Sequence, residues 1–218
     1  MLNFHTHQSV VLQNDTSVVS LFVGEHVKFA ENQLYTIGIH PWHSGSAMVG
    51  EWLLELAHQL QNPNCIGVGE VGLDKFRGAP IHTQITLLEQ QAQIAQQHGK
   101  PLIIHCVRAW NELIAVKRKV KTTVPWAIHG FRGKPELVRE LVREGFYISF
   151  GEILTHPSPA IVGSLREVPL DRLFLETDEE QVSIDKVYAA TADILKISLT
   201  DLESHINSNF ADFFGLSI

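Results

Sequence analysis

The sequence predicts an α/β fold, specifically a (β/α) TIM-like barrel, on the basis of three observations. From residue 47 onward, short β-prone runs alternate with longer runs of helical periodicity, which indicates parallel strands covered by helices. About eight segments qualify as strands, the number that such a barrel needs. Ligand-type side chains close several of these strands, and a barrel gathers strand ends at one mouth. An open doubly wound sheet would have difficulty bringing them to one point.

The first quarter of the chain is expected to be the irregular part. A strand leads into Asn3-Phe4-His5-Thr6-His7, and two further strands are expected at 18–23 and 34–39. Only about ten residues separate the last two, which is at the short limit for a helical crossover between parallel strands. We therefore expect a barrel that is distorted or abbreviated near the N-terminus.

The remaining elements alternate regularly. A helix over 47–61 is indicated by apolar residues at helical spacing, including Trp52, Leu56 and Leu60. Gly99 follows one predicted helix end and Pro135 begins another, both in favoured positions. The expected strands are 65–71, 101–106, 124–129, 146–150 and 172–176, with 72–78 as a loop. The expected helices are 81–98, 111–120, 135–144, 158–167, 184–197 and 199–214.

Composition indicates one globular domain over residues 1–218. The chain is 44% hydrophobic and 19% charged, and it contains no linker-like stretch. With two cysteines, neither a disulfide framework nor a cysteine-based zinc site is expected. No apolar run approaches the ~20 residues needed to span a bilayer, and a cleaved leader would remove the candidate ligands that begin at His5. We expect a cytoplasmic protein, monomeric, with a dimer as the alternative.

Six residues form a candidate metal centre. Because side chains alternate along a strand, His5 and His7 point the same way. Later strand ends supply Glu70, His105, His129 and Asp178. Four imidazoles and two carboxylates are more ligands than one tetrahedral ion can bind. This number suits two divalent ions that share a bridging carboxylate. Such ligands suit Zn²⁺, Mn²⁺, Fe²⁺ or Ni²⁺ more than Mg²⁺, and the sequence does not choose among the five.

Asp178 is the candidate catalytic base. It follows the last predicted strand, where a carboxylate can touch a metal, bind the bridging water and carry its proton to the leaving group. The alternative for Asp178 is a helix N-cap. Glu176 lies two residues earlier and is either an orienting partner of a histidine ligand or a plain polar residue.

With these residues in place, the chain resembles the TatD-like metal-dependent deoxyribonucleases, a branch of the amidohydrolase superfamily. The matching motifs run through nearly the whole chain in the family's order. They are F-H-T-H at 4–7, G-I-H-P-W at 38–42, G-E-V-G-L-D at 69–74, P-L-I-I-H-C at 101–106, H-G-F-R-G at 129–133, L-E-T-D at 175–178 and N-F-A-D-F-F-G at 209–215.

The resemblance implies a role for each candidate ligand. It assigns His5, His7 and Asp178 to one metal, and His105 with His129 to the second. Glu70 corresponds to the bridging carboxylate, a place that many amidohydrolases fill with a carboxylated lysine. His40 matches a further family histidine, expected to contact substrate phosphate, with a plain loop histidine as the alternative.

Three departures from the family pattern concern the substrate pocket. The family's arginine two residues after the histidine that matches His105 is replaced by Val107, and Arg108 stands one position later. The final aspartate is followed by Glu179-Glu180-Gln181-Val182 instead of Ala-Pro and hydrophobics. The chain is also short around its first helix. These acids and the net charge of −7 argue against a broad electropositive face for long nucleic acid.

The leading function hypothesis is a hydrolase that cleaves phosphodiester bonds in DNA, as a 3′-end exonuclease, through a metal-activated water. Candidate phosphate contacts are Lys75, Arg77, Arg108 and Arg132, with solvated surface charge as the alternative for each. The substrate is therefore expected to be DNA or a small phosphoester.

Two other classes stay open. One keeps the metals and acts on a small amide, lactone or phosphomonoester, and the other is a non-catalytic metal-binding scaffold. Histidinol-phosphatase-like phosphoesterases rank lower, because they end in an Asp-x-His pair where this chain has Glu-Thr-Asp.

Overall fold

A computed structural model of the chain describes residues 1–8, 16–25 and 33–216. The described strands form a sheet whose strand order follows the sequence. The strands are β1 (Leu2–Thr6), β2 (Thr16–Phe22), β3 (Tyr35–Gly38), β4 (Cys65–Asp74), β5 (Leu102–Val107), β6 (Trp126–Ile128), β7 (Phe146–Phe150) and β8 (Leu173–Leu175).

Helices alternate with the strands from α1 onward, as predicted. They are α1 (Val49–Gln59), α2 (Ile81–His98), α3 (Trp110–Val120), α4 (Pro135–Arg143), α5 (Pro159–Glu167), α6 (Ile184–Leu195) and α7 (Leu199–Phe214). Three short 3-10 turns occur at η1 (Pro41–His43), η2 (Glu152–Leu154) and η3 (Leu170–Arg172). Among the helices of the described ranges, none is long and apolar enough to cross a membrane.

The described residues divide into two compact units. Unit 1 comprises Met1–Val19 and Ile128–Ile218, and unit 2 comprises Ser20–Ala127. Our expectation of a single domain stays a prediction. The stretch on which the abbreviated crossover between β2 and β3 depends includes residues 26–32, which lie outside the described residues.

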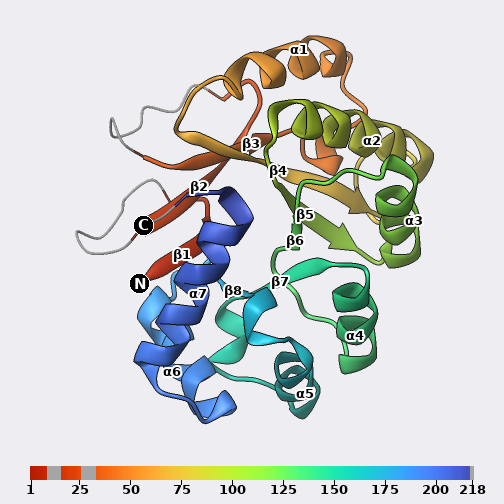
Figure 1. The fold of residues 1–218 in the computed structure, drawn as a ribbon. Coiled ribbons are helices and arrows are strands. Elements are labelled where there is room, and N and C mark those ends of the chain that lie inside the picture. Colours follow the sequence, from red (N-terminus) through yellow and green to blue (C-terminus); the bar gives the residue numbers. More distant parts are fainter. Residues whose placement is uncertain (9–15, 26–32, 217–218) are drawn as a thin grey trace. The chain divides into compact units, whose positions relative to one another are not determined.

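In unit 1, aromatic packing fixes the first and last strands together. The ring of Phe4 in β1 stacks on Phe174 in β8 with centroids 4.0 Å apart, and Phe213 of α7 meets Phe4 edge-on at 5.6 Å. Figure 1 shows α7 running alongside β1. The chain then pairs with itself beyond β8, because Thr6 and Asp178 form a parallel bridge. The carboxyl ends of β1 and β8 are therefore neighbours.

Two buried polar side chains tie the helices of unit 1 to these strands. Asn209 of α7 donates to the carbonyls of Leu170 and Leu173, at 2.7 and 2.8 Å, just where β8 begins. The Tyr188 hydroxyl of α6 donates to the Leu2 carbonyl at 3.0 Å. Each contact satisfies a strand carbonyl in the interior and sets the height of the strand.

In unit 2, β3, β4 and β5 pair in parallel and α2 packs on β4. The buried residues of α2 recur at helical spacing and include two glutamines, Gln84 and Gln91. Gln91 accepts from the Ile39 amide at 2.8 Å and donates to the Ile39 carbonyl at 3.1 Å. This pair of hydrogen bonds holds the backbone beyond β3, next to His40.

Strand β4 is longer than predicted. We expected a strand over 65–71 followed by a loop, but pairing with β5 continues through Gly72, Leu73 and Asp74. Gly72 was placed at the start of the predicted loop, but it lies within the strand and allows close approach of β4 and β5. Its φ is +148°, and a Cβ at this position would lie 1.9 Å from the carbonyl oxygen of His105. Only glycine fits there, so Asp74 is carried into the interior.

Gly72→Ala should therefore destabilise the protein strongly, by at least about 2 kcal/mol, through backbone strain and the clash with the His105 carbonyl. Urea unfolding followed by circular dichroism measures the change. Gly50→Ala is the matched control, because a Cβ at Gly50 in α1 meets nothing within 4 Å. The control should gain up to about 1 kcal/mol. Equal stabilities of the two variants would contradict the role of Gly72.

Candidate metal centre

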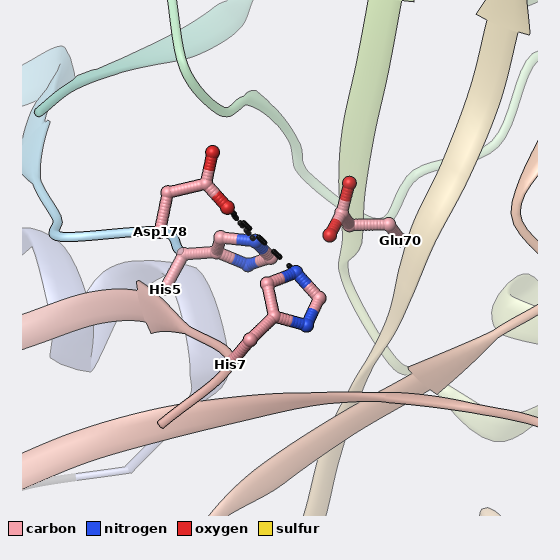
Figure 2. Close-up of side chains that lie close together, drawn as sticks. All are labelled: His5, His7, Glu70 and Asp178. Carbon is pink, nitrogen blue, oxygen red and sulfur yellow. Dashed lines mark ion pairs between the residues drawn. The ribbon is translucent and has the colours of Figure 1, made fainter. Parts of the chain in front are cut away.

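Unit 1 carries a set of ligand-type side chains that we call the first ligand cluster. Figure 2 shows His5, His7 and Asp178, with Asp178 directed at both imidazoles. Asp178 Oδ1 lies 3.7 Å from His5 Nε2 and 3.7 Å from His7 Nε2. The other members, His129 and Glu176, offer ligand atoms that lie within 4.8 Å of one another and of Asp178.

The main chain holds Asp178 against β1. The amides of Thr177 and Asp178 both donate to the His5 carbonyl, at 3.3 and 3.1 Å, and the His7 amide donates to the Asp178 carbonyl at 3.2 Å. Asp178 has a φ of +53°, in the left-handed region that aspartate and asparagine tolerate better than most residues. This conformation turns the carboxylate toward the two histidines and does not continue the strand.

Glu176 is fully buried and faces His129. Its Oε1 lies 3.7 Å from His129 Nδ1 and accepts a hydrogen bond from the Gly130 amide at 2.6 Å. Burial alone would raise the pKa of Glu176, but the His129 imidazole and then His5 hold it below its usual value. The carboxylate favours a proton on His129 Nδ1, and in that tautomer Nε2 has the lone pair for a metal. This geometry fits the predicted orienting role of Glu176.

Unit 2 carries a second ligand cluster, made of His40, Glu70, Asp74 and His105. Glu70 Oε2 lies 3.6 Å from His40 Nε2 and 3.6 Å from His105 Nδ1. Glu70 and His40 are 4% and 3% exposed, so these groups meet in a nearly dry environment. His40 precedes η1, and its Nδ1 accepts from the Trp42 amide at 3.3 Å, which directs Nε2 toward Glu70.

Asp74 is a member that sequence reasoning missed, because we placed it in a loop. Its Oδ2 lies 3.5 Å from His105 Nε2, and it accepts from the Trp42 indole nitrogen at 2.7 Å. Burial alone would raise the pKa of Asp74, but the Trp42 donor, the Phe76 amide and His105 together lower it. Asp74 thus stands to His105 as Glu176 stands to His129. The position of Asp74 inside G-E-V-G-L-D was the available signal.

The predicted phosphate contacts have varied surroundings. Lys75 pairs with Glu112 at 2.6 Å, and Arg132 pairs with Glu180 at 3.6 Å. The Arg77 guanidinium lies 4.4 Å from the centroid of the Trp42 ring. Arg108 directly follows β5, is exposed and has a φ of +57°.

Both clusters have the donor chemistry of divalent transition metals. Imidazole nitrogens and carboxylate oxygens converge without sulfur, the ligand set that suits Zn²⁺ and related ions. In unit 1 the atoms of His5, His7 and Asp178 lie within 4.8 Å of one another, and in unit 2 the same holds for His40, Glu70 and His105. Such clusters on parallel strands that alternate with helices are typical of metal-dependent enzymes.

The family follows from comparison with known proteins. The model of TatD-related DNases matches residues 9–215, so the chain belongs to that family. It is 30% identical over 181 residues to an uncharacterised metal-dependent hydrolase of Buchnera aphidicola, covering 81% of this chain and 68% of that protein. It is 31% identical over 129 residues to the human 3′-5′ RNA nuclease TATDN2, covering 56% of this chain and 17% of that protein. The protein is a metal-dependent hydrolase.

A solved structure shows the same fold. The crystal structure of YjjV, a TatD homologue from Escherichia coli, matches with a TM-score of 0.79 at 20% identity, covering 92% of this chain and 86% of that one. The predicted (β/α) TIM-like barrel class is thereby confirmed.

Glu176→Gln should weaken metal binding about 10- to 100-fold, because an amide group cannot both accept from Gly130 and favour the same tautomer of His129. Equilibrium dialysis against Zn²⁺ or Mn²⁺ with metal analysis measures the change. Glu203→Gln in α7 is the control and should bind metal as the parent does. Unchanged affinity in the Glu176 variant would remove the orienting role.

Proposed function

We propose that this protein hydrolyses phosphodiester bonds at the 3′ end of single-stranded nucleic acid, with DNA as the expected substrate. The observation that carries the proposal is the first ligand cluster, where Asp178 faces two histidines of one strand end. Membership in the family of TatD-related DNases supports it. The nuclease named among the relatives adds support, and because that relative acts on RNA we include RNA among the substrates to test.

We further propose that the protein holds two divalent ions, with the ligands that the family resemblance implies. His5, His7 and Asp178 would hold one ion, His105 and His129 the other, and Glu70 would bridge them. Bound divalent ions supply a Lewis acid for the phosphoryl oxygen and lower the pKa of a water molecule. The converging nitrogen and oxygen donors within each cluster support this assignment.

Within this proposal, each protein group has a defined task. Asp178 accepts the proton of the attacking water and returns it to the leaving oxygen. The side chain of Asp178 is 33% exposed, so a substrate can contact its carboxylate. Glu176 and Asp74 keep His129 and His105 oriented. His40, Lys75, Arg77, Arg108 and Arg132 are the proposed substrate contacts.

The proposal is tested with end-labelled single-stranded DNA and RNA incubated with protein loaded with Mg²⁺, Mn²⁺, Zn²⁺ or Co²⁺. We expect shortening from the 3′ end, and its position is read by labelling either end. Absence of cleavage with all four metals would overturn the proposed nuclease activity. A panel of lactones, amides and phosphomonoesters run in parallel then identifies the bond that is cleaved.

Asp178→Asn should lower kcat by about 10²–10⁴-fold, the usual contribution of a positioned general base. The fold should be unchanged, since asparagine tolerates the left-handed backbone at this position. Asp185→Asn, at an exposed site in the first turn of α6, is the control and should retain activity. Full activity of the Asp178 variant with metal bound would favour a scaffold that does not use this residue.

A small phosphoester is the second candidate substrate, and one observation favours it. The pocket beside Asp178 is lined by Glu152 and Glu180 as well as Arg132. The ion pair of Glu180 with Arg132, at 3.6 Å, partly neutralises the cation that would otherwise meet a second phosphate. These carboxylates disfavour a long polyanion more than they disfavour a single phosphate group.

Glu180→Gln should therefore tighten binding of a single-stranded oligonucleotide about two- to fivefold, as expected for release of an exposed ion pair. The plot of log affinity against log salt should steepen by about 0.7, because Arg132 gains one phosphate contact. Fluorescence anisotropy measures both quantities. Glu179→Gln is the control, because it removes one negative charge and leaves the Arg132–Glu180 ion pair intact. It should leave the salt slope unchanged. Equal salt slopes in the two variants would contradict the proposal that Glu180 keeps Arg132 from contacting a second phosphate.

A cytoplasmic location and a monomeric state also remain predictions. Fractionation of the native host and analytical ultracentrifugation of the full chain test them, with a dimer as the alternative outcome of the second measurement.

A further inference from the structure

Two large aromatic side chains lie exposed near the second ligand cluster. Trp42 is 43% exposed and Phe76 is 75% exposed. Of the large hydrophobic side chains exposed in the described part of the chain, these two are the aromatic ones. Exposed apolar area of this kind is typical of surfaces that bind a ligand or partner, although single exposed hydrophobic residues are ordinary. The case for a ligand therefore depends on how the two residues are held.

One buried carboxylate anchors both aromatic residues. Asp74 Oδ2 accepts from the Trp42 indole nitrogen at 2.7 Å, and Asp74 Oδ1 accepts from the Phe76 backbone amide at 2.8 Å. The same Oδ2 atom lies 3.5 Å from His105 Nε2. Asp74 is itself 3% exposed, and its backbone amide donates a hydrogen bond to the Gln84 side-chain oxygen at 2.7 Å. Asp74 is therefore held firmly in place. The Trp42 ring and the backbone of Phe76 are thus fixed relative to a candidate metal ligand.

The Trp42 ring lies next to two histidines of the second ligand cluster. Its centroid is 4.6 Å from that of His40 and 5.9 Å from that of His105. A planar group held against Trp42 would therefore bring an attached phosphate close to Glu70 and its histidines. Spacing of this kind suits a nucleotide, whose base and phosphate are joined through one sugar.

The local charge also suits a nucleotide. The Arg77 guanidinium lies over the Trp42 ring at 4.4 Å. Lys75 pairs with Glu112, and among the described residues no carboxylate forms an ion pair with Arg77. An aromatic surface with a neighbouring cation offers stacking and phosphate contact together, the combination found in sites for single-stranded nucleic acid.

We propose that Trp42 and Phe76 form a stacking site for the base of the terminal nucleotide of a single-stranded substrate. The inference rests on the proposed function and specifies which part of the substrate the protein grips. Every nucleobase has a π-face, so the site would bind the terminal base with little sequence preference. Arg77 would hold the adjoining phosphate beside the second ligand cluster.

The test compares two oligothymidylates that differ only in the 3′-terminal residue, which is either thymidine or an abasic tetrahydrofuran. Both carry a 5′-fluorescein, and binding is measured by anisotropy with the metal-loaded full chain in the Asp178→Asn background. We expect the base-terminated strand to bind about tenfold more tightly, the usual gain from one stacked base. Phe76→Leu should reduce this preference severalfold and leave affinity for the abasic strand unchanged.

Three further variants separate stacking from other effects. Phe76→Tyr should restore the preference, and Trp42→Leu should reduce it as Phe76→Leu does. Leu54→Ala is the control, because Leu54 is 75% exposed on α1 and is not aromatic. Circular dichroism checks that each variant is folded. If Trp42→Leu is not folded, the test depends on Phe76→Leu alone.

Equal affinity of the parent for the two strands would overturn the stacking site. A preference that survives Phe76→Leu and Trp42→Leu would overturn the assignment to these residues. Cleavage assays with the unsubstituted protein are read separately. Cleavage without base preference defeats this inference and leaves the proposed function standing, whereas base preference without cleavage does the reverse.

Discussion

Each ligand cluster depends on a buried carboxylate held against an imidazole. Removing a carboxylate from water is costly unless hydrogen bonds replace its hydration. Glu176 accepts a hydrogen bond from the Gly130 amide, and Asp74 accepts from the Trp42 indole and the Phe76 amide. An imidazole adds electrostatic stabilisation to each, with His129 3.7 Å from Glu176 and His105 3.5 Å from Asp74. Because these carboxylates cannot move, the rings beside them have one orientation. The ring nitrogen that faces away from each carboxylate is then available for a metal ion, as proposed.

Buried polar groups on the outer helices extend the same principle to the backbone. Gln84 of α2 donates to the carbonyls of Asp74, Arg77 and Ala79, and Gln91 brackets Ile39. These side chains satisfy backbone groups in segments that leave the sheet and would otherwise lack partners. The backbone at His40, beyond β3, and at Asp74, the last residue of β4, is consequently held by side chains of α2.

The cations near the clusters are organised for local contacts more than for a broad field. Lys75 and Arg132 each face a glutamate, and Arg77 lies over an aromatic ring. Together with a net charge of −7, this pattern leaves little long-range attraction for a polyanion. The proposed substrate grip therefore relies on short-range interactions, namely metal coordination, a few phosphate contacts and stacking of a terminal base.

The sequence by itself determined the alternation of strands and helices, because hydrophobic periodicity reports which residues face the interior. It also singled out candidate metal ligands, because histidines and acids at the ends of apolar strands differ from their surroundings. These candidates are His5, His7, Glu70, His105, His129 and Asp178. Only the tertiary structure showed that β4 continues to Asp74, because the close approach at Gly72 depends on the neighbouring strand. For Glu176 the sequence left two roles open, and the structure places its carboxylate beside His129. Likewise, only the structure placed Asp74 beside His105, which is distant in the chain. Pairing of this kind leaves no periodic trace in the sequence, so it cannot be predicted from local spacing.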